Sequence, residues 1–554
     1  MEDYNIANTL ATVAERIPGQ TGLIVPTGGG YRKWTFGDLH SITDGFAHRL
    51  TAAGISRGDR VVLMVRPSVE FICLTFALFK TGAVVVLIDP GMGYKNLLKC
   101  IAQIKPVGFI GIPKAHIFKT LIPKPFATVK TNICVGFSGG IFGASLDADR
   151  MLAESSGSGV KKYQGNSTAE DDPAAVLFTT GSTGPPKGVR YDHSVFYAQL
   201  QLIRDYFGII QHDIDQPAFP LFALFSTALG ACAVIPDMNP SKPAQVNPAK
   251  FIRSIQDHGV TYSFGSPAIW RVVSRYCLKQ KITLTSLKKV LMAGAPVPGD
   301  LIESTRAILP PDAEIYTPYG ATECLPVSAI TSSEILAETW KKTRQGQGTC
   351  VGKPLPGNEI RIIPISDQPL GRWREDAVLP VGQTGEIVVK GPVVTRCYEN
   401  NEPETRLAKI EDNNGFWHRM GDVGYLDEQN RLWFCGRRGH RVAARDTTYF
   451  TICCEAVVNE HPEVFRSALV GIGEMGSQVP VMLVEPIARP KNPTRLLAEV
   501  RELAGRHPLT APIDHFLIHP SFPVDIRHNA KIFREKLAVW AATRIHDRGE
   551  QCGR

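Results

Sequence analysis

A strand–helix–strand pattern near the N-terminus limits the folds that this chain can adopt. Residues 60–67 (RVVLMVRP) and 83–90 (AVVVLIDP) are short apolar runs rich in β-branched residues, and residues 68–82 between them have the composition of a helix. Strands joined in this way lie parallel, because the helix carries the chain back to the end where the first strand began. The same order recurs at 174–180 and 193–208. The sequence therefore predicts an α/β protein with stacked parallel sheets covered by helices.

The pattern changes after about residue 350. Short strands separated by tight turns follow one another between residues 385 and 437, which is typical of antiparallel sheet. Because 554 residues are too many for one ordinary core, we predict a large N-terminal domain, residues 1–436, and a small α+β domain, residues 437–554. Residues 138–171 are rich in Gly, Ser, Asp and Ala and are expected to form a surface connection.

Charge and cysteine content exclude several classes of protein. The chain has 61 basic and 53 acidic residues, a net charge of +8 that is expected to be spread along its length, so no nucleic-acid partner is predicted. Its 12 cysteines include no Cys-x-x-Cys pair, which argues against a zinc site or a disulfide framework. No apolar run reaches about 18 residues, and the first residues lack the pattern of a signal peptide. We therefore predict a cytoplasmic protein without a transmembrane segment.

A loop rich in glycine and hydroxyls is the first candidate binding site. In residues 177–188 (LFTTGSTGPPKG), backbone N–H groups and hydroxyls can donate to several phosphate oxygens, and Lys187 adds a positive charge. This lysine is followed by Gly188 rather than by Ser or Thr, so the loop differs from that of P-loop enzymes. A strand is expected before the loop and a helix after it. The candidate phosphate ligands are Thr179, Thr180, Gly181, Ser182, Thr183, Gly184 and Lys187.

A second segment carries groups suited to a nucleotide and a cation. In residues 316–323 (YTPYGATE), Tyr319 offers a flat face for a base, and Gly320 allows the chain to turn beneath it. Thr322 can donate to a phosphate, and Glu323 is a hard oxygen ligand suited to Mg²⁺.

A third segment, residues 417–440, carries groups suited to a ribose. The carboxylate of Asp422 can accept from both hydroxyls of a ribose, as the acid of dinucleotide-binding folds does. Arg437 follows after a predicted β-hairpin, which would return it to the same place. A turn residue beside Gly421 is the alternative interpretation of Asp422.

These motifs occur in the order found in the ANL superfamily of adenylate-forming enzymes. The chain resembles that superfamily in LFTTGSTGPPKG, MAGAP (292–296), YTPYGATE, TGEIVVKGP, GDVGYLDEQNRLWFCGR and a late lysine, and the likeness spans nearly the whole chain. The resemblance implies a large adenylation domain, with stacked sheets and a small β-barrel-like subdomain, and a small mobile lid. It also implies a reaction that joins a carboxylate to the α-phosphate of ATP and releases pyrophosphate, with ATP and Mg²⁺ as cofactors.

The resemblance assigns a role to each motif. The ATP ligands that it implies are residues 179–187 for the phosphates, Gly294, Ala295, Pro296, Tyr319 and Gly320 for adenine, Thr322 for the α-phosphate, and Asp422 and Arg437 for the ribose. Glu323 would hold Mg²⁺. Lys531 stands where the family's catalytic lysine enters from the lid, where it would neutralise charge building on the carboxylate and the α-phosphate.

Three departures from the family pattern concern the step after adenylation. Ala223 in PLFALFS (220–226) stands where most members have a histidine, which either leaves room beside the carboxylate or is a neutral replacement. At the hinge, Asp446 replaces a glycine that helps CoA-forming members build the tunnel for the thiol, and Cys453 replaces a glutamate. The segment PVDIRHNAKI is two residues longer than usual. Adenylation is therefore expected to be intact, while thioester formation is altered.

An activated acid that does not meet CoA still needs a nucleophile. A 3-hydroxyl on the substrate can attack internally, and proximity makes that step effectively unimolecular. The chain resembles the branch of the superfamily that makes β-lactones in olefin biosynthesis, especially in PVDIRHNAKIFREKLA and TTGSTGPPKGVRYDH. That resemblance implies a 2-alkyl-3-hydroxy fatty acid as substrate and other olefin-pathway enzymes as partners.

Some assignments stay open from the sequence alone. His193 is a candidate base for the 3-hydroxyl, and the alternative is a histidine that caps or packs at the start of a helix. A long-chain fatty acyl-CoA or acyl-carrier ligase with an unusual hinge is the second candidate function, and consumption of CoA distinguishes it. A non-catalytic acyl or nucleotide sensor is the third. The joint presence of five residues argues against it: Lys187, Glu323, Asp422, Arg437 and Lys531.

Overall fold

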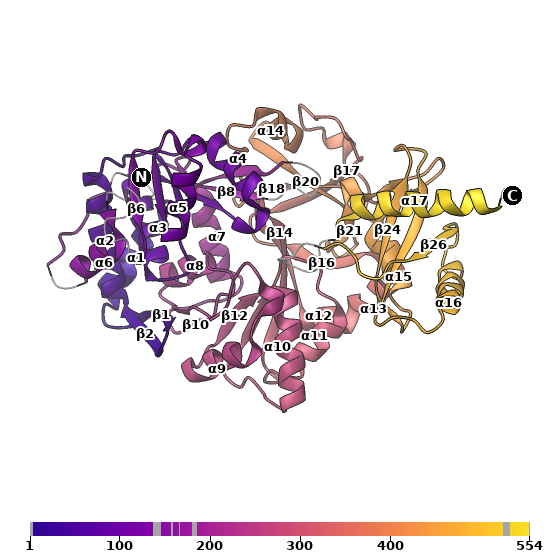
Figure 1. The fold of residues 1–554 in the computed structure, drawn as a ribbon, viewed down its shortest axis with the longest axis horizontal. Coiled ribbons are helices and arrows are strands. Elements are labelled where there is room, and N and C mark those ends of the chain that lie inside the picture. Colours follow the sequence, from indigo (N-terminus) through magenta and orange to yellow (C-terminus); the bar gives the residue numbers. More distant parts are fainter. Residues whose placement is uncertain are drawn as a thin grey trace.

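The computed structural model describes residues 4–136, 146–156, 159–165, 167–179, 185–524 and 532–552. Stacked layers of sheet and helix make up the indigo-to-orange part of the chain, and a smaller yellow unit projects from one end (Figure 1). The predicted α/β class is confirmed by this arrangement.

The first strand–helix–strand pattern of the sequence forms as predicted. β3 (Arg60–Met64) and β4 (Val84–Ile88) are parallel neighbours joined by α3 (Val69–Thr81). The Ser68 side chain caps the helix by accepting a backbone N–H, and the helix ends at Gly82, whose φ of 72° suits glycine. α3 is buried on nearly all sides, which agrees with its almost entirely apolar sequence.

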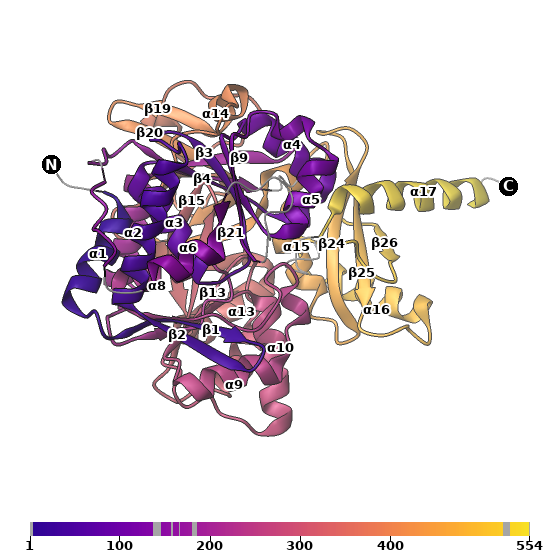
Figure 2. The same cartoon turned by 60° about the vertical axis from the view of Figure 1, so that its left-hand side comes forward.

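A seven-stranded sheet forms around this unit in the described residues. Its order is β7–β6–β5–β3–β4–β8–β9, and only β8 and β9 pair antiparallel. Val61 and Val62 on β3 belong to two different cores, so helices cover both faces of the sheet. The other strands are β5 (Gly108–Gly111), β6 (Thr131–Cys134), β7 (Leu146–Asp147), β8 (Pro173–Thr179) and β9 (Lys187–Asp192). The covering helices are α1 (Ile6–Arg16), α2 (Phe36–Ala52), α3, α4 (Tyr94–Ile104), α5 (Pro113–Leu121) and α6 (Ala148–Ser155) (Figure 2).

The second sheet holds fourteen strands of the described chain. Its order is β17–β18–β20–β21–β16–β15–β14–β13–β12–β10–β11–β1–β2, with β19 beside β20. The strands β1, β11, β10, β12, β13 and β14 pair in parallel, whereas every pairing from β14 to β17 is antiparallel. The switch thus comes at β15 (Cys324–Thr331), before the expected position near residue 350, because β14 and β15 form a hairpin across the YGATE turn.

The remaining strands of this sheet have the following bounds. They are β1 (Thr21–Thr27), β2 (Gly30–Thr35), β10 (Ile214–Asp215), β11 (Cys232–Val234), β12 (Tyr262–Gly265), β13 (Lys289–Met292), β14 (Glu314–Ala321), β16 (Thr349–Pro354), β17 (Glu359–Ile363), β18 (Gly385–Lys390), β19 (Lys409–Asp412), β20 (Gly415–Leu426) and β21 (Leu432–Arg437). Helices again cover both faces, since Leu291 on β13 packs toward α7 while Val290 and Met292 pack toward α9 and α10. These helices are α7 (His193–Asp205), α8 (Phe222–Leu229), α9 (Pro248–His258), α10 (Pro267–Gln280), α11 (Gly299–Arg306) and α14 (Glu402–Ala408).

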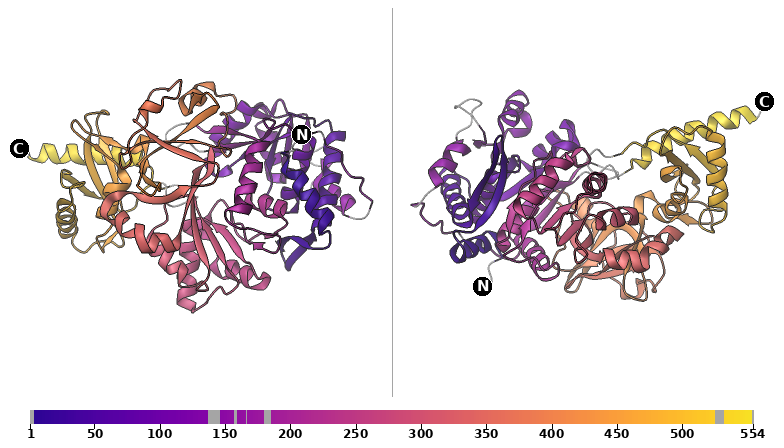
Figure 3. Two further views of the ribbon diagram at one scale, coloured as in Figure 1. Left: turned by 180° about the vertical axis from the view of Figure 1, so that it is seen from behind. Right: turned by 90° about the horizontal axis from the view of Figure 1, so that it is seen from below.

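The C-terminal unit has cores of its own. It begins after the short 3₁₀ turn at Arg438–His440 and projects from one end of the larger part (Figure 3). Cys453 on its first helix packs against Val423 and Cys435, which joins the unit to β20 and β21. Its elements are β22 (Val442–Ala443), β23 (Thr448–Tyr449), α15 (Thr451–Val458), β24 (Val464–Ile472), β25 (Val479–Pro486), α16 (Pro493–Gly505), β26 (His515–Ile518) and α17 (Arg534–Cys552).

Two expectations about connecting segments are wrong. The segment 138–171 is more than a surface connection, because it contains β7 and α6, and Met151 and Leu152 of that helix are buried. The glycine-rich loop is followed by strand β9 and only then by helix α7, so the loop closes a hairpin rather than leading into a helix. No helix among the described residues is long and apolar enough to cross a membrane.

Candidate active site

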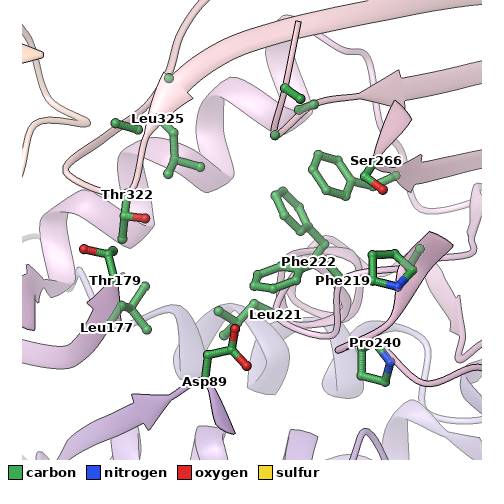
Figure 4. A pocket seen from close by; sticks show the side chains of 18 of the residues that line it. Asp89, Leu177, Thr179, Phe219, Leu221, Phe222, Pro240, Ser266, Thr322 and Leu325 are labelled. Atoms are coloured by element: carbon green, nitrogen blue, oxygen red, sulfur yellow. The ribbon is translucent and has the colours of Figure 1, made fainter. Parts of the chain in front are cut away.

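Those of the predicted nucleotide residues that the structure describes gather in one large cleft. The cleft has a volume of about 2150 Å³, and its wall includes the ends of β3, β4, β8 and β13 together with Arg534 of the C-terminal unit. Thr179 and Thr322 stand on one wall, with Phe219, Phe222 and Ser266 across from them (Figure 4). The cleft therefore opens where both large sheets meet the C-terminal unit.

One end of the cleft is shaped by an aspartate held between two partners. Asp422 on β20 and Arg437 on β21 are paired directly across their strands, with Arg437 Nη1 2.9 Å from Asp422 Oδ1. The Tyr319 hydroxyl donates to Asp422 Oδ2 at 2.6 Å. Burial raises the pKa of Asp422, although both neighbours favour its charged form. The hairpin thus brings the two predicted ribose ligands together, as the sequence spacing suggested.

The predicted adenine pocket is built from two tight backbone turns. Gly294 has a φ of 96° and begins the turn after β13, which places Ala295 and Pro296 on the cleft wall. At Gly320 a Cβ atom would lie only 2.6 Å from the carbonyl oxygen of Cys324. Only glycine therefore fits beneath the Tyr319 side chain in this hairpin.

The phosphate end of the cleft joins a lysine and a glutamate through one tyrosine. The Tyr398 hydroxyl donates to Glu323 Oε1 at 2.7 Å. Lys187 Nζ lies 5.1 Å from the centre of the Tyr398 ring and 2.5 Å from Glu404 Oε2. Thr179 is the cross-strand partner of Lys187, so both ends of the glycine-rich loop meet at this wall. The loop residues Thr180, Gly181, Ser182, Thr183 and Gly184 lie outside the described residues.

Thr322 and Glu323 are fixed by contacts of their backbone carbonyls. The Tyr191 hydroxyl donates to the Thr322 carbonyl at 2.5 Å. The Thr395 N–H and hydroxyl both donate to the Glu323 carbonyl, at 2.9 and 3.0 Å. Backbone anchoring leaves both side chains at the cleft wall.

The donor set fits a magnesium ion bound with phosphates. Across the described ranges there is no group of three or more His, Cys, Asp and Glu side chains that could hold a metal on its own. Mg²⁺ usually takes one or two carboxylates and completes its octahedral shell with water and substrate phosphates. A single glutamate, Glu323, close to the predicted phosphate ligand Lys187 fits this kind of coordination. Glu323 is the residue that would hold the ion.

The segment leading to the C-terminal helix reaches the cleft. Lys531 lies outside the described residues, but Ile532 and Arg534 both line the cleft. Nη2 of Arg534 donates to both carboxylate oxygens of Glu455 on α15, at 2.6 and 2.7 Å. Burial raises the pKa of Glu455, against the effect of Arg534. The start of α17 is therefore anchored to α15 at the cleft.

The opposite end of the cleft is aromatic, with a buried acid beneath it. Phe222 of α8 stacks on Phe264 of β12, with ring centres 3.8 Å apart. Ser226, one turn further along α8, donates to Asp215 Oδ2 and accepts from the Tyr262 hydroxyl at 3.1 Å. Asp215 Oδ1 has no hydrogen-bond partner among the described residues. Burial raises the pKa of Asp215 to about 8, so this acid is mostly neutral at neutral pH.

Comparison with known proteins places this chain in a family. The AMP-binding enzyme family matches residues 10–399. The chain belongs to the AMP-binding enzyme family. It is similar to the olefin β-lactone synthetases of Stenotrophomonas maltophilia (strain K279a) and Xanthomonas campestris pv. campestris, each 44% identical, over 98% and 97% of this chain and 99% and 97% of theirs.

A solved structure shows the same fold at low identity. The O-succinylbenzoate coenzyme A synthetase of Bacillus subtilis, in complex with ATP and magnesium ion, is 21% identical with a TM-score of 0.74, over 96% of this chain and 99% of that one. The predicted adenylate-forming class and its large sheets are thereby confirmed for this AMP-binding enzyme.

The AMP-binding enzyme has two basic residues in the region of Glu323 and Asp422, Lys409 and His418, that the sequence interpretation did not use. Lys409 Nζ donates to the Thr395 carbonyl, and burial lowers the pKa of Lys409 to about 8 although Glu323 opposes the shift. His418 lines the cleft, and burial lowers its pKa well below the usual range. His418 was within reach from the sequence, since it stands four residues before Asp422 in WHRMGD.

Two residues singled out from the sequence face away from the cleft. His193 is the first residue of α7, is 1% exposed, and has its ring 5.4 Å from that of Phe79. Burial lowers its pKa to about 4, so the geometry favours the packing alternative over a base. Ala223 is also fully buried in the core, so the expected room beside the carboxylate is absent there. The face of α8 that lines the cleft carries Phe222 and Ser226 instead.

The hinge departures also lie away from the cleft. Asp446 is exposed and lines a separate pocket of about 970 Å³ beside Gln478 and Pro480. Cys453 is buried in the apolar contact between α15 and β21, where a glutamate would be costly. Neither Asp446 nor Cys453 is among the described residues that line the cleft.

Proposed function

We propose that this enzyme activates a 2-alkyl-3-hydroxy fatty acid as its acyl-adenylate and then closes the adenylate to a β-lactone in olefin biosynthesis. The observation that carries the proposal is the position of Tyr319, Asp422, Lys187 and Glu323 at one end of a cleft whose other end is aromatic and apolar. The 44% identity to two olefin β-lactone synthetases over nearly full length supports the same reaction.

The first step joins the acid to AMP. A carboxylate oxygen of the substrate attacks the α-phosphorus of ATP, and the bond from that phosphorus to the bridging oxygen breaks to release pyrophosphate. We assign Asp422 and Arg437 to the ribose hydroxyls and Tyr319 to the adenine face. Lys187 would exchange Glu404 for a phosphate oxygen, and Lys531 would neutralise charge on the carboxylate and α-phosphate.

We also propose a cation ligand and a division into domains. Glu323 would hold Mg²⁺, which supplies charge neutralisation for the phosphates. The related coenzyme A synthetase of Bacillus subtilis binds ATP and magnesium, which supports this choice. Separate hydrophobic cores support a boundary near residues 436–437 between the adenylation domain and the lid.

The second step needs no further substrate. The 3-hydroxyl oxygen attacks the acyl carbon, the bond from that carbon to the AMP oxygen breaks, and AMP leaves while the hydroxyl proton is lost. Holding hydroxyl and acyl carbon in one folded substrate makes the step unimolecular. AMP is a good leaving group, so the reaction does not require His193.

Location and partners follow as further proposals from the chemistry. A β-lactone is reactive, so an enzyme that consumes it is best placed beside the one that makes it. We propose that the enzyme acts in the cytoplasm and that it contacts other enzymes of olefin synthesis.

The test uses purified protein, ATP, Mg²⁺ and a synthetic 2-alkyl-3-hydroxy fatty acid without CoA. AMP release together with a product one water lighter than the acid is the expected result. AMP release that begins only when CoA is added, with a thioester as product, would replace the proposal with the long-chain acyl-CoA ligase.

A further inference from the structure

One stretch of this chain carries almost all of its net charge. Residues 90–146 contain seven lysines and no aspartate, glutamate or arginine, so seven of the eight net positive charges come from this stretch. The expectation of an evenly spread charge is therefore wrong. A local excess of this size creates a positive surface that attracts anions.

The structure places these lysines on two adjacent helices. α4 and α5 lie side by side on the surface, and the rings of Tyr94 and Phe118 meet with centres 5.2 Å apart (Figure 2). Lys95, Lys99 and Lys124 are exposed. None of the seven lysines has an ion-pair partner among the residues that the structure describes. Their charge is thus free to act outward.

Apolar side chains are exposed among the lysines. Tyr94 is 72% exposed and Leu121 is 74% exposed, and Ile117 and Ile122 are exposed as well. On α5, Lys114, Ile117 and Leu121 recur at three- and four-residue spacing and so lie on one face of the helix. Exposed apolar groups fringed by lysines are the pattern of a helix that lies on a membrane surface.

This surface is continuous with the cleft. Tyr94, Lys114, Ile117, Phe118 and Leu121 also line its rim. A hydrophobic acid that leaves a bilayer at this rim would enter the cleft without crossing water. We call this surface the docking face, and define it by Tyr94, Lys95, Lys99, Lys114, Ile117, Leu121, Ile122 and Lys124.

We propose that the docking face binds the surface of an anionic phospholipid bilayer, from which the enzyme takes its substrate. Charge complementarity selects the partner, because lysines near an anionic leaflet are attracted to it, and the aromatic and aliphatic side chains can sit at the headgroup level. A nucleic acid or the phosphates of CoA would leave Leu121 and Ile122 without a role. Membrane binding itself does not depend on the proposed function. Only the uptake of a substrate from the bilayer rests on it.

The test is flotation of the full-length protein with vesicles. Vesicles of phosphatidylglycerol and phosphatidylcholine in equal parts should carry the protein, vesicles of phosphatidylcholine alone should not, and 0.5 M NaCl should release it. The charge variant Lys95→Glu/Lys99→Glu/Lys124→Glu should bind at least tenfold more weakly. The control variant Lys279→Glu/Lys341→Glu/Lys491→Glu changes the net charge equally at exposed lysines elsewhere and should bind as the wild type does.

Two further arms separate the apolar contribution and the enzymatic reaction. Leu121→Ser/Ile122→Ser should weaken vesicle binding while the matched Val381→Ser/Ile487→Ser, at exposed positions far along the chain, should not. AMP formation from a short, water-soluble 3-hydroxy acid should be the same in the charge variant and the wild type. Failure of the wild type to form AMP would count against the proposed function alone.

Three outcomes would overturn the docking face. They are equal loss of binding in the charge variant and its control, equal binding to neutral and anionic vesicles, and release of the protein from vesicles by CoA at micromolar concentration. The last outcome would assign the lysines to a nucleotide instead.

Discussion

The two ends of the cleft treat charge in opposite ways. At the nucleotide end, Asp422 is paired with Arg437 and Lys187 with Glu404, so the charges are held in place by partners that ATP could replace. The other end, which we call the acyl end after its proposed ligand, is formed by Phe222, Phe264 and Ser226; there Asp215 is buried and hydrogen-bonded to Ser226, and burial raises its pKa to about 8. One end therefore holds paired charges, which suits the nucleotide that we propose to bind there, whereas the other suppresses charge beside aromatic side chains.

The sharpest way to break this comparison is to remove the charge of Glu323. Glu323→Gln keeps the size of the side chain but loses the anionic ligand proposed for Mg²⁺. We expect the rate of pyrophosphate release to fall at least ~100-fold, the size typical of losing one transition-state electrostatic contact. Initial-rate assays at saturating ATP measure this effect.

A matched control for Glu323 is the exposed Glu428. Glu428→Gln should leave the rate unchanged, because the side chain lies at the hairpin turn after β20, away from the cleft. A rate for Glu323→Gln within threefold of the wild type would remove Glu323 from the proposed site.

Asp422→Asn tests the paired carboxylate of the nucleotide end. The amide keeps the shape but places an N–H donor beside Arg437, so the contacts to a ribose should weaken. We expect the KM for ATP to rise about 30-fold, which corresponds to about 2 kcal/mol, with little change in the KM for the acid. A rise in the KM for the acid alone would place Asp422 in the acyl site.

The nucleotide end could be predicted from the sequence because its geometry is local. YTPYGATE is one hairpin turn, and Asp422 and Arg437 are cross-strand partners of another hairpin, so short spacing nearly determines their contacts. Tyr398 and Lys409 could not be predicted in this way, because both lie far along the chain from Glu323 and approach it only in the folded protein. The spacing of residues within a motif cannot predict contacts between segments that are far apart in the sequence.

The acyl end resisted prediction for a different reason. Ala223 was chosen by its position in a family motif, yet the phase of α8 turns it into the core and exposes Phe222 to the cleft. The phase of an apolar helix cannot be read when nearly all of its residues are apolar. For the same reason the role of Ser226 beside Asp215 emerged only from the fold.

Phe222→Ala tests whether the aromatic end of the cleft binds the acid. It removes the ring that stacks on Phe264 and should raise the KM for a long-chain acid about tenfold, since about 1.5 kcal/mol or more of apolar burial is lost. The KM for ATP should stay within twofold and serves as the internal control. Equal changes in both constants would show that the variant disturbs the fold rather than the acyl site.

The smallest effect is expected from Asp215→Asn, a change in how the free energy of unfolding depends on pH. The substitution removes the ionisable group but keeps a buried polar side chain of the same size. The pKa of Asp215 in the folded protein lies near 8, above its ordinary value near 3.8, so the folded state holds the proton more tightly than the unfolded chain. Its contribution to the free energy of unfolding is therefore complete below about pH 4 and is lost as the pH rises toward 8. Asn cannot ionise, so the variant should lose less stability than the wild type between pH 5.5 and 8.5.

Thermal unfolding at several pH values measures that difference. The exposed Asp257→Asn is the control, and its melting temperature should follow the wild type at every pH. Parallel pH profiles for Asp215→Asn and the wild type would mean that Asp215 is charged in the folded protein. The acyl end would then hold an ionised carboxylate near the alkyl chains, and the contrast between the two ends of the cleft would fail, because both would present fixed charge to the substrate.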